Sequence, residues 1–326
     1  MSRPQQTKRH HFVPKAYLKA FCDEKGRLLV YRKDSPSVPL HVRPDATQFR
    51  RHYYSQPTPE GGRDNNSLET VFSNVEAGWP ETVARLSRRE DVNDRLENIF
   101  MFMALQRARV PAMRDAAEAM MAQTYKDAMQ VMLKSSWLPA PPPGLKLDDV
   151  RVAIDPHQSI HAMVEILNGT GELFSMVGMV AVHNATGHPF LTSDNPVIWF
   201  DPGLPFGEQR PYTIDRDQGD IFLFFPVTPT LALVGSPMYK EIYGRHGLLH
   251  SNVPDVAWVN QLNAQVCRFA YEAVIATASG NELLIAEHAG VSPVHEAVEI
   301  PTAKGVTTLH RMAFGCRTAK LKTDLD

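Results

Sequence analysis

The sequence predicts a mixed α+β fold, in which a helical middle section packs with short, mostly antiparallel strands. Apolar residues between Ser67 and Lys134 recur with a period near 3.6 residues, which is typical of amphipathic helices. Short apolar segments bounded by Gly, Pro, Asn and Asp lie on both sides of this section and favour strands. Helices and strands that are segregated along the chain in this way indicate α+β organisation.

The N-terminal region is predicted to contain one short helix, one strand and one loop. Pro14 suits the first turn of a helix over 15–21, because the amide hydrogen that proline lacks is not needed there. A turn at 23–26 leads into an apolar strand over 27–32. Three prolines within 34–44 predict a loop.

The helical section is predicted to contain two interrupted helices. The first begins near Ser67, and Gly78 and Pro80 interrupt it because proline cannot donate the helical hydrogen bond. The second is kinked at Pro111 and continues to Lys134.

The remaining sequence, after a proline-rich break at 139–144, is predicted to alternate between helices and strands. Helices are expected over 157–167 and 253–275, and 319–326 is expected to be a frayed tail. Turn chemistry at 184–187 predicts a hairpin between the first two strands. The expected strands are 176–183, 189–192, 221–225, 231–234 and 307–314.

Length and composition favour one domain over residues 1–326, with sub-regions at 10–138 and 145–316. Hydrophobic residues make up 43% of the chain, which supplies enough apolar material for a core. The net charge is −2, so a surface that coats nucleic acid is disfavoured. A small or single-stranded substrate fits this charge better than a long duplex.

The cysteines and the N-terminal sequence predict a cytoplasmic protein. Three scattered cysteines lack the Cys-x-x-Cys spacing of zinc sites and are too few and too dispersed for a disulfide framework. The N-terminal residues are polar and basic, without the apolar segment of a signal peptide. No clean apolar run is long enough to span a bilayer, so no membrane partner is expected.

Two adjacent imidazoles, His10 and His11, are the first candidates for catalysis. Neighbouring residues on an extended strand point to opposite faces, so one of the two is expected to enter a given site. A neutral imidazole serves as a general base or as a metal ligand near physiological pH. The alternative is a basic N-terminal arm, because cationic residues surround the pair: Arg3, Lys8, Arg9, Lys15 and Lys19.

A polar turn at 192–196 is the second candidate. Asp194 and Asn195 are its expected catalytic groups and Ser193 its expected binding group, because loops at strand ends project polar side chains. Asp194 would bind a metal, orient a histidine or act as a base, and Asn195 would hold a ligand or an oxyanion. In the alternative, both side chains bond local backbone amides before Pro196. We expect one of the two histidines to lie close to this turn.

The carboxylates of Glu69 and Glu76 are the third candidates. They lie seven residues apart on one flank of the predicted helix, about 10 Å apart along its axis. Flank carboxylates are half-buried, so we expect them to pair with Arg or His side chains. For Glu69 considered by itself, a structural ion pair with the next helix is the favoured interpretation.

Gln106 and Arg109 are the expected binding residues of the next helix, where Arg107 falls within the apolar stripe. A guanidinium stays charged in any environment and therefore needs a partner at an apolar face. Glu76 and Asp194 are the expected partners. Such a pair is structural, or it presents the arginine to a phosphate.

These motifs resemble a widespread, mostly bacterial family of unknown function, from about His10 to about Val274. The family opens with His-His-x-Val-Pro-x-x-Tyr-Leu-x-x-Phe, as at 10–21 here, and later has Thr-Ser-Asp-Asn-Pro-Val, as at 192–197. The resemblance implies functional roles for residues in both blocks, and it adds Asn263 as a binding residue. Its other matches are Leu68-Glu69, Glu76, Gln106, Arg109, Pro111, Phe225-Pro226-Val227-Thr228-Pro229 and Leu262-Asn263.

These residues favour a hydrolase or transferase acting on a phosphate-bearing substrate, a nucleotide or nucleic acid, in the manner of a nuclease or phosphodiesterase. His11 would be base or ligand, Glu69 and Glu76 ligands or acid and base, and Arg109 the charge stabiliser. Carboxylates and an imidazole in one cleft would also suit a divalent ion such as Mg²⁺, Mn²⁺ or Zn²⁺.

The alternative is a non-catalytic binding or regulatory protein, in which the same cluster is structural. Recognition would then lie in the loops at 43–63 and 200–219. Solvent access separates the two readings. An enzyme should place His11, Glu76, Arg109 and Asp194 around one open cleft, whereas a structural cluster should be closed to solvent.

Overall fold

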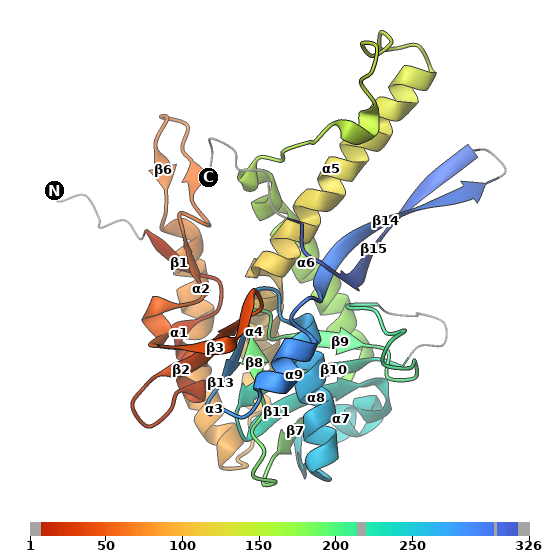
Figure 1. The fold of residues 1–326 in the computed structure, drawn as a ribbon. Helices are drawn as coiled ribbons and strands as arrows, with labels where there is room; N and C mark the ends of the chain where they lie inside the picture. The colour runs from red at the N-terminus through yellow and green to blue at the C-terminus, as the bar shows by residue number, and fades with distance from the viewer. Residues whose placement is uncertain (1–7, 214–219, 303–304, 319–326) are drawn as a thin grey trace.

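Two sheets and a group of helices form the body of the protein in the computed structural model, which describes residues 8–213, 220–302 and 305–318 (Figure 1). The larger sheet has the strand order β12-β7-β11-β10-β9. Neighbouring strands in this sheet are antiparallel, except that β12 and β7 are parallel to each other. The strands are β7 (Gly178–His183), β9 (Ile198–Phe200), β10 (Phe222–Thr228), β11 (Leu231–Ser236) and β12 (Leu249–Asn252).

The second sheet is antiparallel and joins strands that are distant in the sequence. Its order is β3-β2-β13-β8, so a late strand lies between an early strand and a middle one. Both sub-regions of the chain therefore contribute to one sheet. The strands are β2 (Leu28–Arg32), β3 (Ser35–Val42), β8 (Thr192–Ser193) and β13 (Ala273–Ala276).

Three two-stranded ribbons complete the β-structure, and they pair β1 with β4, β5 with β6 and β14 with β15. The β5–β6 hairpin extends beyond one end of α2, and the β14–β15 hairpin projects from the body (Figure 1). The strands are β1 (Arg9–His11), β4 (Phe49–Arg51), β5 (Gln56–Pro57), β6 (Arg63–Asp64), β14 (Ser292–Thr302) and β15 (Gly305–Gly315).

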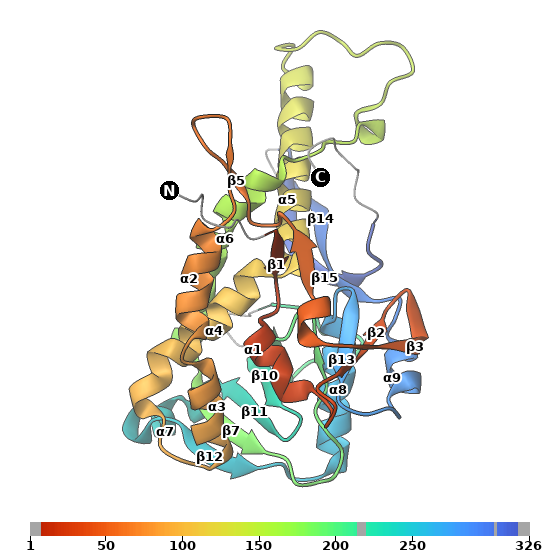
Figure 2. The ribbon, with the colours of Figure 1, turned by 90° about the vertical axis from the view of Figure 1, so that its left-hand side faces the viewer.

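Helix α4 is the centre of the helical layer, and it packs against α2, α3, α5 and α6. Helix α5 projects far from the body, as Figures 1 and 2 both show. No helix in the described ranges combines the length and apolar character that a membrane crossing requires. The helices are α1 (Lys15–Leu18), α2 (Ser67–Glu76), α3 (Trp79–Ser87), α4 (Leu96–Arg109), α5 (Pro111–Lys134), α6 (Pro156–Met176), α7 (Lys240–His246), α8 (Val256–Phe269) and α9 (Glu282–Glu287), with 3₁₀ turns at Lys19–Phe21, Pro44–Ala46, Asn93–Arg95, Leu147–Asp149 and Pro237–Tyr239.

The mixed α+β class and the interruptions of the helical section agree with the sequence. Gly78 caps the start of α3 and Pro80 lies in its first turn, so α2 and α3 are separate helices. Pro111 was expected to kink a continuous helix, and this expectation is wrong. Val110 is extended, with ψ of 151°, because the residue before a proline avoids the helical region, and α5 starts anew at Pro111.

The proline-rich segment 34–44 contains a strand, so the predicted loop is wrong. Strand β3 pairs antiparallel with β2 from Leu28 to Arg32, with a register shift between Val30 and Arg32. It lies at the edge of its sheet, where a proline need not donate a ladder hydrogen bond. The edge position therefore tolerates Pro36 and Pro39.

The hairpin expected around 184–187 is also wrong. The turn exists, since Asn184 Oδ1 accepts from the amide of Thr186, but the strands on its two sides lie in different sheets. The amide of Phe190 instead donates to the carbonyl of Pro229. Helix α6 likewise continues past its predicted end to Met176, because burial of Leu173 in the core outweighs the low helix propensity of glycine.

The late helix is shorter than predicted. Helix α8 ends at Phe269, and the last residues of the predicted range form β13 at the centre of the second sheet. A short buried apolar run has no periodicity that distinguishes a strand from a helix, which explains the error. The tail predicted at 319–326 lies outside the described residues.

The two sequence blocks at 10–21 and 192–197 meet in the core through Tyr17 and Thr192. The hydroxyl of Tyr17 lies 2.5 Å from Oγ1 of Thr192 and donates to the carbonyl of Pro226 over 2.6 Å. Both Tyr17 and Thr192 are fully buried, and the Tyr17 ring stacks on Phe225. The N-terminal arm is thus anchored to both sheets.

The substitution Tyr17→Phe should lower the free energy of unfolding by about 1–3 kcal/mol, because the buried carbonyl of Pro226 loses its donor and the buried hydroxyl of Thr192 loses its partner. Urea denaturation measures this as a lower midpoint at an unchanged slope. Tyr125→Phe is the matched control, since Tyr125 is 58% exposed. Equal midpoints for the two variants would show that the buried hydroxyl contributes nothing.

Candidate functional site

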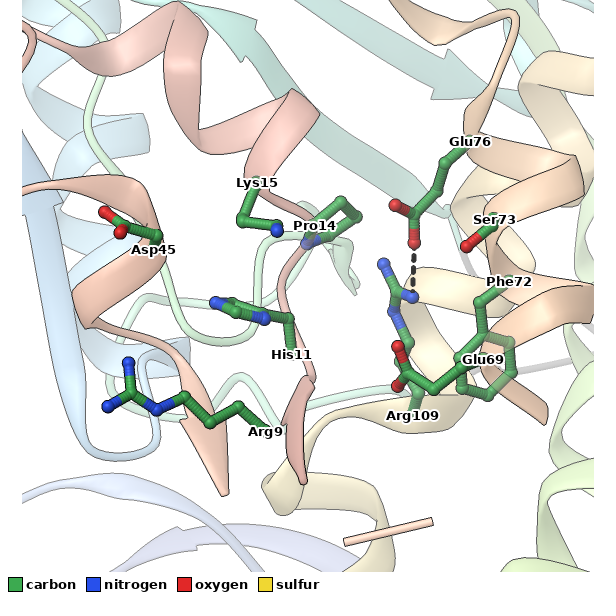
Figure 3. A pocket seen from close by; sticks show the side chains of 10 residues that line it. All are labelled: Arg9, His11, Pro14, Lys15, Asp45, Glu69, Phe72, Ser73, Glu76 and Arg109. Carbon is green, nitrogen blue, oxygen red and sulfur yellow. Dashed lines mark hydrogen bonds and ion pairs between the residues drawn. The ribbon is translucent and has the colours of Figure 1, made fainter. Parts of the chain in front are cut away.

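A cleft of about 410 Å³ lies between the N-terminal arm and the helical layer (Figure 3). β1 contributes Arg9 and His11, and α1 contributes Lys15 together with its preceding Pro14. Across the cleft, α2 contributes two glutamates and α4 contributes an arginine. The full lining is Arg9, His11, Pro14, Lys15, Asp45, Glu69, Phe72, Ser73, Glu76 and Arg109.

The buried floor of the cleft is built around Arg109, whose side chain is 2% exposed. Its Nη1 lies 2.7 Å from Oε1 of Glu76, and its Nη2 donates to Oε1 of Gln106 over 3.1 Å. The guanidinium also lies over the ring of Phe72. The predicted pair of Arg109 with Glu76 is therefore confirmed, and Gln106 supports it from the same helix.

Gln106 lies behind the floor and ties it to the N-terminal arm. Its Nε2 donates to the carbonyl of Phe12 over 2.9 Å, while the hydroxyl of Tyr54 donates to the carbonyl of Arg109. These bonds link α4 to β1 and to the chain that follows β4. Gln106 positions Arg109 and does not itself line the cleft.

His11 lies in the wall of the cleft as a neutral imidazole. Burial, together with the positive charges of Lys15 and Arg109, lowers its pKa to about 4, against the opposing charge of Asp45. Its Nε2 is buried without a hydrogen-bond partner among the described residues. Its ring packs on Phe49 and, in Figure 3, lies on the same side of β1 as Asp45 and Lys15.

Glu69 lies on the opposite side of β1, beside Arg109 (Figure 3). Burial raises the pKa of Glu69 to about 7; Glu76 adds to this shift, whereas Arg109 and Lys15 oppose it. Its Oε1 is buried and has no hydrogen-bond partner in the described part of the chain. The carboxyl group therefore keeps its proton to a higher pH than an exposed glutamate does.

The rim of the cleft is exposed and carries charges of both signs. Arg9, Lys15 and Asp45 are solvent-exposed, and so is Ser73, one helical turn after Glu69. The cleft is thus open to solvent on its charged side. From the sequence, Arg9 and Lys15 were placed in a basic N-terminal arm and were not assigned to a site. Nothing in the sequence indicated Asp45 or Ser73 as site residues.

His10 points away from the cleft, as the alternation of a strand requires. It is fully buried and stacks on Tyr54, whose amide donates to its Nδ1 over 2.7 Å. Of the two imidazoles, only His11 lines the cleft. His10 fixes the chain that follows β4 against the N-terminal arm.

Asp194 lies in a closed core position instead of the cleft. It is fully buried, and its two oxygens accept from the amides of Tyr271 (2.7 Å), Glu272 (2.5 Å) and Ala273 (3.2 Å). Burial and the charge of Glu272 raise its pKa to about 6, while the backbone amides oppose the shift. Asp194 therefore holds the chain at the start of β13.

The other polar residues of this turn and its surroundings also bond backbone groups. Ser193 Oγ accepts from the amide of Asn195, and Asn195 Nδ2 donates to the carbonyl of Phe269 and to the hydroxyl of Tyr212. Asn263 accepts from the amide of Leu191 and donates to the carbonyl of Pro189. None of Ser193, Asn195 and Asn263 lines the cleft.

Arg107 is buried without an acidic partner in the described ranges. Its guanidinium lies 3.3 Å from the ring centroid of Tyr212 and 5.1 Å from that of Trp199. Burial lowers its pKa to about 10. Aromatic faces, whose quadrupoles attract cations, therefore take the place of the carboxylate that the sequence led us to expect.

The structure thus brings together His11, Glu69, Glu76 and Arg109 and separates them from His10, Ser193, Asp194, Asn195 and Asn263. In the part of the chain that the structure describes, no group of three or more His, Cys, Asp or Glu side chains is arranged to hold a metal ion. The divalent ion anticipated for this cleft therefore has no preformed ligand set here.

Comparison with known proteins places the chain in a family. A family model described as "Protein of unknown function (DUF4238)" matches residues 9–280, and the chain belongs to this family. The resemblance seen in the sequence motifs is thereby confirmed. No curated protein and no solved structure matches the chain at a significant level.

The substitution Asp194→Asn should destabilise the fold by about 1–3 kcal/mol, because an amide group would turn a donor toward buried backbone donors. Thermal denaturation measures this as a lower Tm. Asp149→Asn is the control, since Asp149 is exposed. A folded variant with the Tm of the control would contradict the structural role.

The substitution Glu69→Gln should raise stability at pH 8 by about 1–2 kcal/mol and change it little at pH 4.5. The folded-state pKa of Glu69 is raised above its unfolded value, so wild-type stability falls as pH rises through the window from about 4.5 to about 7. A neutral amide removes that loss. Urea denaturation at both pH values measures the difference.

The matched control for this pH dependence is Glu165→Gln, because Glu165 is exposed on α6. It should leave the pH dependence of stability as it is in the wild type. A parallel shift of Glu69→Gln at both pH values would show that the carboxyl group is not held in its protonated form by the fold.

Proposed function

We propose that the cleft binds a phosphate-bearing substrate and that its side chains hydrolyse or transfer the phosphate group. One observation carries this proposal. His11 Nε2 and Glu69 Oε1 are both buried, both lack a hydrogen-bond partner among the described residues, and both belong to side chains that line the same cleft. Unpaired buried polar atoms are costly in a purely structural cluster, so a ligand that pairs them explains their presence.

The cations of the cleft supply the binding energy for a phosphate. Lys15 and Arg9 are exposed at the rim, and Arg109 lies at the floor with its orientation fixed by Glu76 and Gln106. Arginine and lysine form charge-assisted hydrogen bonds with phosphate oxygens, and these are stronger than neutral ones. Glu76 acts in this scheme as the residue that positions Arg109.

The two titratable groups have the protonation states that acid–base catalysis needs. At neutral pH His11 is unprotonated and accepts the proton of the attacking water or hydroxyl group. Glu69, with a pKa of about 7, donates a proton to the leaving oxygen as its bond to phosphorus breaks. The new bond between the nucleophile and phosphorus forms in the same step, so one proton is taken up and one is released.

Electrostatic coupling makes the proposed base stronger when the substrate binds. Lys15 and Arg109 lower the pKa of His11 in the free protein. A bound phosphate dianion offsets these charges and raises the pKa of His11 toward its ordinary value. The same anion raises the pKa of Glu69 further, which favours its protonated form.

Solvent access supports the enzymatic reading for the cleft and the structural reading for the turn. His11, Glu76 and Arg109 surround a cleft with an exposed rim, whereas Asp194 is fully enclosed. A non-catalytic role therefore accounts for the Asp194 region, where every bond of the carboxylate goes to a backbone amide.

Turnover of phosphate esters tests the proposal. The wild-type protein should hydrolyse a phosphomonoester or a phosphodiester from a panel assayed with and without a divalent metal. His11→Asn and Glu69→Gln should each lower kcat by about 100-fold or more, the usual contribution of a general acid or base. Both should keep the substrate affinity within a small factor, because the cations remain.

Matched controls are His161→Asn and Glu165→Gln, which change exposed residues of α6 outside the cleft. They should keep wild-type activity. Calorimetry in buffers of different ionisation enthalpy should show net proton uptake near pH 7 when sulfate binds, since this phosphate mimic does not itself titrate there. Binding without proton uptake and without turnover of any ester would leave the cleft as a non-catalytic binding site and overturn the proposal.

A further inference from the structure

One face of the β1–β4 ribbon continues the cleft outward with two arginines and an aromatic ring. Arg9 pairs with Arg51 and His11 with Phe49 in the register of this ribbon. Residues two apart on a strand share a face, so Arg9, His11, Phe49 and Arg51 lie on the same side. His10 and Arg50 occupy the other side, where His10 is buried and Arg50 pairs with Glu272.

The two arginines on this face lack an ion-pair partner among the described residues. Arg9 and Arg51 are exposed and lie directly opposite each other, and neither forms an ion pair with any described residue. Like charges at opposing positions of an antiparallel pair destabilise it. An anionic partner that lies across both guanidinium groups would remove this repulsion.

The surrounding sequence concentrates positive charge in the same region. Residues 8–64 contain twelve Lys and Arg and six Asp and Glu, a net charge of +6, whereas the whole chain has a net charge of −2. A basic region within an acidic protein directs polyanions to one surface. The region includes β1, β4 and the rim residue Lys15.

The aromatic ring provides a stacking surface beside these charges. The guanidinium of Arg9 lies 4.9 Å from the centroid of the Phe49 ring, and the imidazole of His11 lies 5.4 Å from it on centroids. Nucleobases of single strands stack on aromatic rings and on guanidinium planes, while phosphates contact the cations. Arginines beside a half-buried aromatic ring therefore suit single-strand binding.

We propose that the substrate of the cleft is the phosphorylated end of a single-stranded nucleic acid. The terminal phosphate lies in the cleft, and the next nucleotides cross the ribbon face of Arg9, Phe49 and Arg51. This inference rests on the proposed function of the cleft and names its substrate class. The three-residue strands of the ribbon are roughly 10 Å long, so this face contacts only the nucleotides next to the phosphorylated end.

Binding of defined oligonucleotides tests this substrate class. The probes are a hexathymidylate with a 5′ phosphate, the same strand with a 3′ phosphate, the unphosphorylated strand, its duplex, thymidine monophosphate and inorganic phosphate. Fluorescence anisotropy, or competition for the unlabelled probes, gives each Kd at several salt concentrations. A phosphorylated single strand should bind about tenfold or more tighter than the mononucleotide and than the duplex.

Variants of the ribbon separate its contribution from that of the cleft. Arg51→Ala should weaken binding of the phosphorylated strand about 3- to 10-fold and reduce the slope of log K against log salt by about 1. Phe49→Leu should weaken the strand more than the mononucleotide, because stacking is lost. Arg151→Ala, which removes an exposed arginine outside the cleft, should change neither affinity. The Tm of each variant shows that it is folded.

Each outcome separates this inference from the proposed function. Equal affinity for the strand and the mononucleotide, or a ribbon variant indistinguishable from Arg151→Ala, overturns the inference even if phosphate esters are turned over. Tighter binding of the duplex than of the strand also overturns it. Strand binding that depends on Arg51 without turnover of any substrate supports the binding surface and overturns the catalytic proposal.

Discussion

The partly buried ion pair of Arg109 and Glu76 is the interaction on which the cleft depends. It joins α4 to α2, and Gln106 extends the same network to the carbonyl of Phe12 in the N-terminal arm. Removing one partner of such a pair leaves a buried charge uncompensated, at about 3–5 kcal/mol. The floor of the cleft is therefore rigid, while its cationic rim stays exposed to solvent.

The same pair gives the two glutamates of α2 different chemical properties. Glu76 is held by the guanidinium, whereas Glu69 lies nearby with a buried, unpaired oxygen and a pKa raised to about 7. A carboxyl group with a raised pKa suits proton transfer, and an ion-paired carboxylate suits positioning. One flank of α2 thus carries a carboxyl group with a raised pKa and a carboxylate held in an ion pair, because their surroundings differ.

The polar block at 192–197 was expected to form part of a catalytic or binding site, but in the structure its side chains bond to the backbone. Asp194, Asn195 and Asn263 all bond backbone groups, and the block meets the N-terminal arm through Thr192 and Tyr17. Buried backbone amides at the start of β13 need acceptors, and a carboxylate satisfies three of them at once. Asp194 therefore fixes the start of β13, the strand that lies between β2 and β8 in the second sheet.

The sequence by itself determined the α+β class and the helical section from Ser67 to Lys134, because helical periodicity is a local property. It named Glu76 and Asp194 as candidate partners for the arginines, because a buried guanidinium needs one, and the structure selected Glu76 for Arg109. Tertiary structure alone decided that β7 and β8 lie in different sheets, that 273–276 is a strand, and that His11 enters the cleft while His10 and Asp194 do not. Strand pairing and solvent access depend on contacts between distant segments, such as β13 with β2, and a single sequence carries no periodic signal for them. The sequence could therefore indicate which polar residues are candidates. Only the fold showed which of them line the open cleft and which, like Asp194, are buried in the core.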